Sequence, residues 1–138
     1  LALVFGNIKQ DHGEIIANIA RDPKDRKRMA VTAAGGKYAH TKYRVLERFG
    51  AYTLICCKLE TGRTHQIRVH MAHIGHPLVG DEKYTHIKNP FGALTQLLHS
   101  ASLELTQPTT GLKIKCTAKP PPNFLKILRI LRNKKYQR

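Results

Sequence analysis

Apolar positions in the first half of the chain fall in short segments that predict β-strands. Residues 1–5 form one apolar run, and residues 14–19 form a second run after a turn-like Asp-His-Gly stretch. Apolar and polar residues alternate over 41–49, and residues 52–59 are almost wholly apolar and β-prone. Alternation with period two indicates a strand with one buried face, whereas a continuous run indicates a central strand. We therefore expect these last two segments to form a hairpin whose second strand is central.

The second half of the chain predicts two helices and another hairpin. Apolar side chains recur at helical spacing twice, at Ile67, Met71 and Ile74 and again at Phe124, Ile127, Leu128 and Leu131. Between these segments, residues 103–106 and 112–117 alternate around a Pro-Thr-Thr-Gly turn, as in a hairpin. Asn123 follows three prolines, and we expect it to cap the second helix. The fold class is therefore α+β, with a mainly antiparallel sheet and two helices.

The net charge indicates which class of partner this 138-residue chain binds. Its length fits one modest domain. Its formal net charge is +15 and its pI is near 10.1, so it attracts anionic partners at physiological pH. Nucleic acid is the expected partner, although charge alone also suits a membrane surface. No apolar run approaches the roughly 20 residues that span a bilayer, so the sequence contains no transmembrane helix, and we expect no membrane partner.

The cysteines indicate a reducing environment. Cys56, Cys57 and Cys116 form no CxxC pair and leave an odd count, which argues against both a disulfide framework and a zinc ribbon. We expect a cytoplasmic monomer with an inert, buried thiol at Cys57. The chain begins with a strand-like run and without methionine, so we expect Leu1 to be the cut end of a longer protein.

The densest polar segment spans residues 60–70, where a glycine-containing turn runs into a predicted helix. The start of a helix presents backbone N–H groups without partners, and these suit a phosphate. Arg63, His65 and Gln66 fall on this first turn and are candidate RNA-binding residues. Arg68 lies one turn later, where its donors could hold a carboxylate or a phosphate; a solvated surface arginine is an equal alternative.

A second candidate contact region is the charged segment 21–28, which holds too many charges for a packed core. We expect a solvated basic loop. Its cations Lys24, Arg26, Lys27 and Arg28 are candidates for RNA phosphate contacts, which depend on salt and carry little sequence information.

Other candidate chemistry is weaker. His70, His73 and His76 are spaced so that a straight helix does not keep them well on one face, and we expect no metal site. Asp81 follows a turn, and we expect its carboxylate to close that turn through backbone amides. Tyr84 could stack on a base, but core packing is the more frequent use of such a residue.

Residues 60–81 read ETGRTHQIRVHMAHIGHPLVGD, with Tyr84 shortly after. This segment closely resembles the C-terminal signature of the RluA/RluD family of RNA pseudouridine synthases. Further likeness falls on residues 1–6, 28–31, 41–45 and 98–101, and it thins out after about Ala118. The resemblance implies that residues 1–138 are the C-terminal portion of a catalytic domain with a mixed, mainly antiparallel bent sheet and flanking helices.

The resemblance also implies an activity. The family converts uridine in RNA to pseudouridine by breaking the C1′–N1 bond and rejoining the uracil through C5, without metal or organic cofactor. A base stacked in a helix must first be flipped out. The catalytic aspartate of the family stands in a His-Arg-Leu-Asp-x-x-Thr-Ser-Gly type motif, which these residues do not contain.

Two residues match functional positions of the family. Arg68 matches the arginine that pairs with the catalytic aspartate, and a guanidinium there would keep a pocket carboxylate ionised. Leu98 matches a pocket leucine near the target base, although ordinary core packing explains it nearly as well. The family's stacking aromatic would fall immediately before Leu1.

The sequence therefore predicts an RNA pseudouridine synthase whose RNA is large-subunit rRNA, with these 138 residues inactive by themselves. A non-catalytic RNA-binding protein of the same fold is the alternative. A basic structural protein of the ribosome ranks lowest, because it would not require the cluster at residues 63–68.

Overall fold

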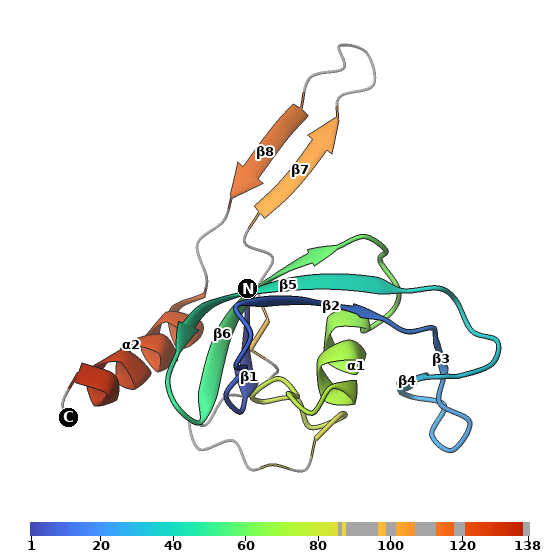
Figure 1. The fold of residues 1–138 in the computed structure, drawn as a ribbon, viewed down its shortest axis with the longest axis horizontal. Coiled ribbons are helices and arrows are strands. Elements are labelled where there is room, and N and C mark those ends of the chain that lie inside the picture. The colour runs from blue at the N-terminus through green and yellow to red at the C-terminus, as the bar shows by residue number, and fades with distance from the viewer. Residues whose placement is uncertain (86, 88–96, 99–101, 107–112, 118–120, 137–138) are drawn as a thin grey trace.

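The structure is a computed structural model that describes residues 1–85, 87, 97–98, 102–106, 113–117 and 121–136. In chain order its elements are β1 (Ala2–Phe5), β2 (His12–Ile16), β3 (Ile19–Arg21), β4 (Met29–Val31), β5 (His40–Arg48), β6 (Tyr52–Leu59), α1 (Gln66–His73), β7 (Ser102–Thr106), β8 (Lys113–Thr117) and α2 (Pro122–Tyr136) (Figure 1). Strands and helices share one chain, which confirms the α+β class.

The main sheet contains four strands in the order β1-β6-β5-β2, and all its pairings are antiparallel. Strand β6 lies between β1 and β5, which confirms the predicted hairpin with a central second strand. The run predicted over 14–19 is divided between two sheets, because β2 ends at Ile16 and β3 begins at Ile19. Its buried residues Ile15 and Ile19 pack in different core clusters, so the chain turns between them.

Two smaller antiparallel sheets accompany the main one. Strands β3 and β4 pair from Ile19↔Val31 to Arg21↔Met29 and enclose the basic segment. Strands β7 and β8 pair from Ser102↔Thr117 to Thr106↔Lys113, as the alternation predicted. Residues 107–112, which include the predicted turn of this hairpin, lie outside the described residues.

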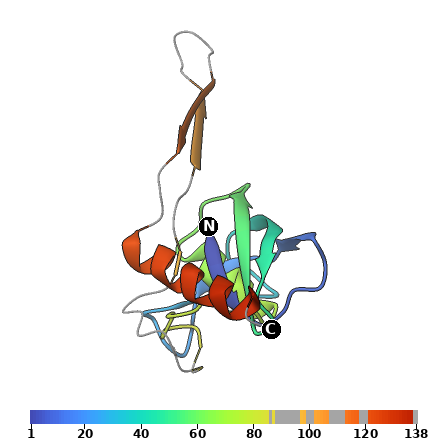
Figure 2. The same ribbon diagram turned by 90° about the vertical axis from the view of Figure 1, so that its left-hand side faces the viewer.

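The helices cover opposite faces of β1, because successive side chains of a strand point to opposite sides of its sheet. Ala2 and Val4 belong to the core cluster that contains Met71 of α1. Leu3 and Phe5 belong to the cluster that contains the apolar stripe of α2, namely Phe124, Ile127, Leu128 and Leu131. Figure 1 shows α1 under the sheet, and Figure 2 shows α2 crossing in front of the sheet in the turned view. All four β1 residues are therefore buried.

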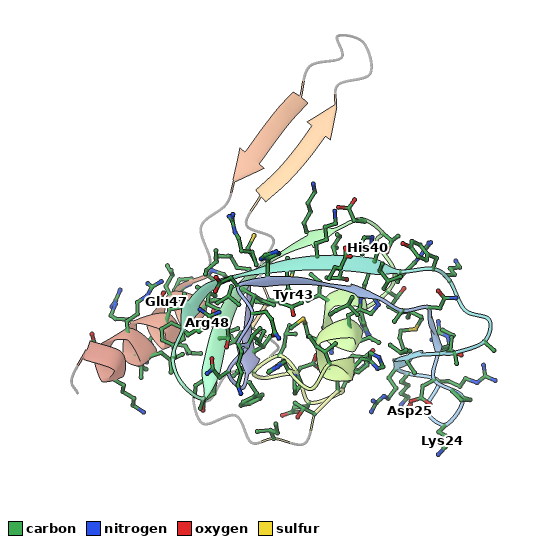
Figure 3. All side chains as sticks on the ribbon, viewed as in Figure 1. Lys24, Asp25, His40, Tyr43, Glu47 and Arg48 are labelled. Atoms are coloured by element: carbon green, nitrogen blue, oxygen red, sulfur yellow. The ribbon has the colours of Figure 1, made fainter. Side chains whose placement is uncertain are left out.

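The start of α2 differs from the prediction. The helix begins at Pro122, so Asn123 lies inside the first turn rather than at the cap. Proline suits the first helical position, because its fixed φ fits the helix and its missing N–H would have no partner there. The first helical hydrogen bond runs from Leu125 N to Pro121 O at 3.1 Å. On the outer side of the helix, Nη2 of Arg132 lies 2.9 Å from Oε2 of Glu47, the β5 residue labelled in Figure 3.

We predict that Phe124→Ala lowers the free energy of unfolding by about 3–5 kcal/mol, because it opens a cavity in the α2 core cluster. Phe124 is 2% exposed, whereas the neighbouring Leu125 is 39% exposed. Leu125→Ala is therefore the matched control and should cost less than about 1 kcal/mol. Urea denaturation of both variants measures the difference, and similar losses would contradict this packing.

Candidate functional site

Gln66, the first residue of α1, anchors the polar turn to strand β5. Its side-chain nitrogen donates to His40 O and to Thr41 Oγ1, both at 2.9 Å. Its side-chain oxygen accepts from the Thr61 hydroxyl at 2.7 Å and from the Arg63 N–H at 2.9 Å. The residue is 3% exposed. Gln66 therefore positions the turn, and the RNA contact predicted for it from the sequence would require these hydrogen bonds to open.

The same network continues into the helix through His70, which is fully buried. Nε2 of His70 lies 2.9 Å from Ala17 O, and Nδ1 lies 2.8 Å from Thr41 Oγ1. A carbonyl oxygen only accepts, so Nε2 carries the proton and Nδ1 accepts from the Thr41 hydroxyl. Burial lowers the pKa of His70, which keeps the ring neutral as this pattern requires.

The helix starts from a residue in an unusual backbone conformation. His65 has φ 54° and ψ 26°, and it is the one non-glycine residue with positive φ in the described part of the chain. Its Nδ1 lies 2.7 Å from the Tyr84 hydroxyl, and the two rings meet edge to face at 5.7 Å. Tertiary contacts of this kind offset the cost of left-handed backbone at a residue with a side chain.

The Tyr84 hydroxyl also accepts a hydrogen bond from the backbone N–H of Met29 at 3.0 Å. The simplest complete pairing has this hydroxyl donate to Nδ1 of His65, so that Nε2 of the ring carries the proton. Burial, followed by the positive charge of Arg68, lowers the pKa of His65 and favours that neutral ring. His65 thus presents an N–H donor beside the start of α1.

Arg68 forms a bidentate ion pair with Asp81. Nε of Arg68 donates to Oδ2 of Asp81 and Nη2 donates to Oδ1, both at 2.9 Å. The two side chains are 11% and 1% exposed, respectively. The hydrogen bond to Asp81 is the main cause that raises the pKa of Arg68. Such planar, two-point pairing fixes the orientation of the guanidinium.

This pair corrects one prediction from the sequence. The Asp81 carboxylate does not close its turn through backbone amides, because a buried carboxylate needs a charged partner and Arg68 supplies it. Among the described residues Arg68 pairs with Asp81, and its pairing with an aspartate outside these residues stays a prediction. Only a weak feature of the sequence indicates the Arg68–Asp81 pair. The segment between the two residues contains Gly75 and Gly80, whose positive φ values let the chain turn back.

The Nη1 edge of the Arg68 guanidinium has no hydrogen-bond partner among the described residues. A guanidinium has five N–H donors, and Asp81 takes those at the Nε and Nη2 edge. Nη1 makes no hydrogen bond to any residue that the structure describes. The ring centre of Tyr84 lies 5.1 Å from the guanidinium carbon, within the range of a cation–π contact. Arg68 can therefore hold a second anion while Asp81 and Tyr84 support it.

The basic loop between β3 and β4 has the solvated character that the sequence predicts. Lys24, Arg26 and Lys27 are exposed, and Figure 3 shows Lys24 at the tip of the loop. Two turns shape this loop, since the Asp22 carboxylate accepts from Lys24 N at 2.9 Å and the Asp25 carboxylate accepts from Lys27 N at 3.0 Å.

Arg28 differs from the other cations of the loop because it is half-buried and faces Tyr84. Its guanidinium carbon lies 5.1 Å from the centre of the tyrosine ring, and its Nε lies 3.3 Å from Oδ2 of Asp22. The structure thus brings together three residues predicted separately, Arg28, His65 and Arg68. We call these three residues with Asp81 and Tyr84 the Tyr84 cluster.

The remaining predicted residues make other contacts. Arg63 is half-buried, and its Nε donates to Tyr38 O at 2.8 Å. Leu98 forms an isolated β-bridge with Ala2 and packs against the core cluster that contains Met71. No hydrogen bond joins Arg63 or Leu98 to the Tyr84 cluster within the described ranges.

The other side chains that the structure describes offer no competing metal or thiol chemistry. Desolvation raises the pKa of Cys57 to about 12, which keeps the thiol protonated and unreactive, although the residue is half-buried rather than fully buried as predicted. Among the described residues, no group of three or more His, Cys, Asp and Glu side chains could hold a metal ion. Within the same part of the chain, neither helix has the length and apolar character needed to cross a bilayer.

Comparison with known proteins relates residues 1–73 to a family described as RNA pseudouridylate synthase. A Bacillus subtilis (strain 168) protein named uncharacterized RNA pseudouridine synthase YlyB is 48% identical over 132 residues. A ribosomal large subunit pseudouridine synthase D from Pseudomonas aeruginosa is 46% identical over 143 residues. Each match covers 95% of this chain but only 43% and 44% of the relative. The chain spans less than half of these proteins.

Solved structures show the same architecture. Human RNA Pseudouridylate Synthase Domain Containing 1 superimposes with a TM-score of 0.73 at 26% identity, over 95% of this chain and 63% of the other. The human Domain Containing 4 protein gives a TM-score of 0.75 at 22% identity, over 95% and 60% of the two chains, and supports the fold alone.

We predict that Asp81→Asn lowers the free energy of unfolding by about 3 kcal/mol, because it leaves the Arg68 guanidinium without its buried counterion. Glu82→Gln removes the same charge from the adjacent, exposed position and is the matched control. It should change stability by less than about 0.5 kcal/mol. Urea denaturation of the two variants tests this, and equal effects would show that the ion pair contributes nothing specific.

We also predict that the chain loses stability as the pH falls below about 6.5, the ordinary histidine value. Folding lowers the pKa of His70 and of His65, so in this range the unfolded chain binds protons that the folded chain excludes. The free energy of unfolding should therefore be smaller at about pH 5 than at about pH 7.5. His70→Gln should reduce this dependence, whereas His12→Gln at an exposed position should leave it intact.

Proposed function

Because the chain belongs to the RNA pseudouridylate synthase family, we propose that it forms part of an enzyme that isomerises uridine in RNA to pseudouridine. The observation that carries this proposal is the pairing of Arg68. Asp81 orients one edge of its guanidinium, and the Nη1 donors on the other edge have no hydrogen-bond partner among the described residues. That arrangement suits the carboxylate that the reaction requires.

The reaction replaces the bond between C1′ and N1 of the uracil with a bond between C1′ and C5. The proton at C5 leaves to solvent, and N1 gains a proton, so atoms and electrons balance without a redox partner. The catalytic aspartate would come from a part of the protein outside these 138 residues, because its motif is not among them. The available edge of Arg68 would keep that aspartate ionised and oriented.

RNA binding would rest on the cations around this site. Lys24, Arg26 and Lys27 extend from the loop into solvent, whereas Arg28 and Arg63 are half-buried. With the net charge of +15, these residues favour phosphate contacts without sequence preference. The name of the Pseudomonas aeruginosa relative, a ribosomal large subunit pseudouridine synthase, supports large-subunit rRNA as the substrate. We also propose a monomer in the cytoplasm, where free thiols such as Cys56 and Cys57 persist.

A second candidate is a non-catalytic RNA-binding protein of this fold. The absence of the family's aspartate motif from the 138 residues favours it. Both candidates bind RNA through the same cations, so affinity alone does not separate them. Turnover does, because only an enzyme needs the orientation of Arg68.

We predict that the intact protein releases tritium from C5 of uridine in a labelled large-subunit rRNA transcript, and that the 138 residues alone bind this RNA without release. Arg68→Ala in the intact protein should lower kcat on the order of 100-fold, because an aspartate in the pocket would lose its orienting partner. RNA affinity should change little, since the basic loop is untouched.

Arg63→Ala is the control arm, because this variant removes a cation near the helix start and should weaken RNA affinity more than turnover. Clear turnover by the 138 residues alone would overturn the assignment of the nucleophile to another part of the protein. An intact protein that binds RNA tightly and releases no tritium would favour the non-catalytic candidate. Equal losses of affinity and kcat in Arg68→Ala would make Arg68 a phosphate contact only.

A further inference from the structure

Tyr84 lies outside every helix and strand, yet its side chain makes more specific contacts than any other in the Tyr84 cluster. It is 8% exposed. Its ring lies beside the guanidinium groups of Arg28 and Arg68, and its hydroxyl bonds to Met29 N and His65 Nδ1. These four partners come from the basic loop with the strand after it and from the start of α1.

We propose that Tyr84 is a positioning residue that fixes Arg28 of the RNA-binding loop relative to Arg68 of the reaction site. This inference rests on the proposed function for the role of Arg68 and extends it to residues that the reaction itself does not require. Tyr84 acts through the two arginines, and touches no reacting atom in this proposal.

The ring provides the first part of the argument. Each guanidinium carbon lies 5.1 Å from the ring centre, so the two positive charges are at most about 10 Å apart. Like charges at this separation repel, and the electron-rich face of an aromatic ring offsets that repulsion. Tyr84 therefore stabilises a pair of cations that the loop and the helix would otherwise hold further apart.

The hydroxyl provides the second part. Met29 directly follows Arg28, and its N–H donates to the Tyr84 oxygen at 3.0 Å. The same oxygen lies 2.7 Å from Nδ1 of His65, the residue that precedes α1. One hydroxyl thus connects the end of the basic loop to the start of the helix that carries Arg68. The loop and the helix are consequently expected to move together when RNA binds.

The two parts of the side chain can be tested separately. Tyr84→Phe retains the ring but removes the hydroxyl, so in the intact protein it should raise KM for the rRNA transcript and leave kcat near the parental value. Tyr84→Leu removes both parts and should also lower kcat, on the order of 100-fold, because the guanidinium of Arg68 loses a supporting face. A general loss of structure would instead change both variants in step with their thermal stability.

Tyr38 supplies matched controls, because it is 51% exposed and lies outside the Tyr84 cluster. Tyr38→Phe and Tyr38→Leu should leave kcat and KM unchanged. If Tyr84→Leu has the parental kcat, or if Tyr84→Phe loses as much kcat as Tyr84→Leu, the positioning role is wrong.

A third arm needs no turnover and separates this proposal from the proposed function. Fluorescence anisotropy measures the RNA affinity of four forms of the 138-residue chain. These are the parent, Arg28→Ala, Tyr84→Leu and the double variant. Arg28→Ala should weaken binding about 10-fold in the parent and less than about 2-fold in the Tyr84→Leu background, since the arginine is already displaced there. Additive effects would overturn the coupling even if the intact enzyme is active. Non-additive effects would support it even if no tritium is released.

Discussion

A single side-chain amide determines where the polar turn and helix α1 lie. Gln66 uses both ends of its amide, and the hydrogen bonds continue through Thr41 to His70 and Ala17 O. Each buried donor in this series has an acceptor, which avoids the cost of unpaired polar groups in a core. Because α1 is only two turns long, its own hydrogen bonds could not fix its direction. The position of Arg68 therefore depends on contacts to strand β5.

Around this fixed helix, the protein balances charge locally within a strongly basic chain. Asp81 neutralises the largely buried guanidinium of Arg68, and the ring of Tyr84 supports two guanidinium groups without adding negative charge. The exposed cations of the loop face solvent, where water and salt screen them. Among the described residues, the exposed positive charge of this region thus lies on the basic loop, whereas the buried charge of Arg68 has a counterion.

Local patterns identified most of the fold, and tertiary contacts decided the remainder. Alternating residues located strands β5, β7 and β8, a continuous apolar run located β6, and the helical stripes located α1 and α2, because these signals depend on neighbours in sequence. The partner of Asp81 and the inward-facing amide of Gln66 depend on how α1 meets distant segments. Asparagine is generally favoured as a helix cap, but Pro122 is the first residue of α2, so Asn123 lies inside the helix. The resemblance assigned a role to Arg68 but none to Tyr84, whose link between the two arginines follows only from its contacts.

Strand β1 has a consequence for the order in which the molecule folds. Its backbone hydrogen-bonding and bridge partners are Tyr52–Ile55 on one edge and Pro77, Leu78, Val79, Leu97 and Leu98 on the other, all far away along the chain. The β5–β6 hairpin, in contrast, closes over a short connection. Contacts that are close in sequence form sooner, because they cost less loop-closure entropy. We expect the hairpin to form early and β1 to insert late, as the strand that joins the two core clusters into one cooperative unit.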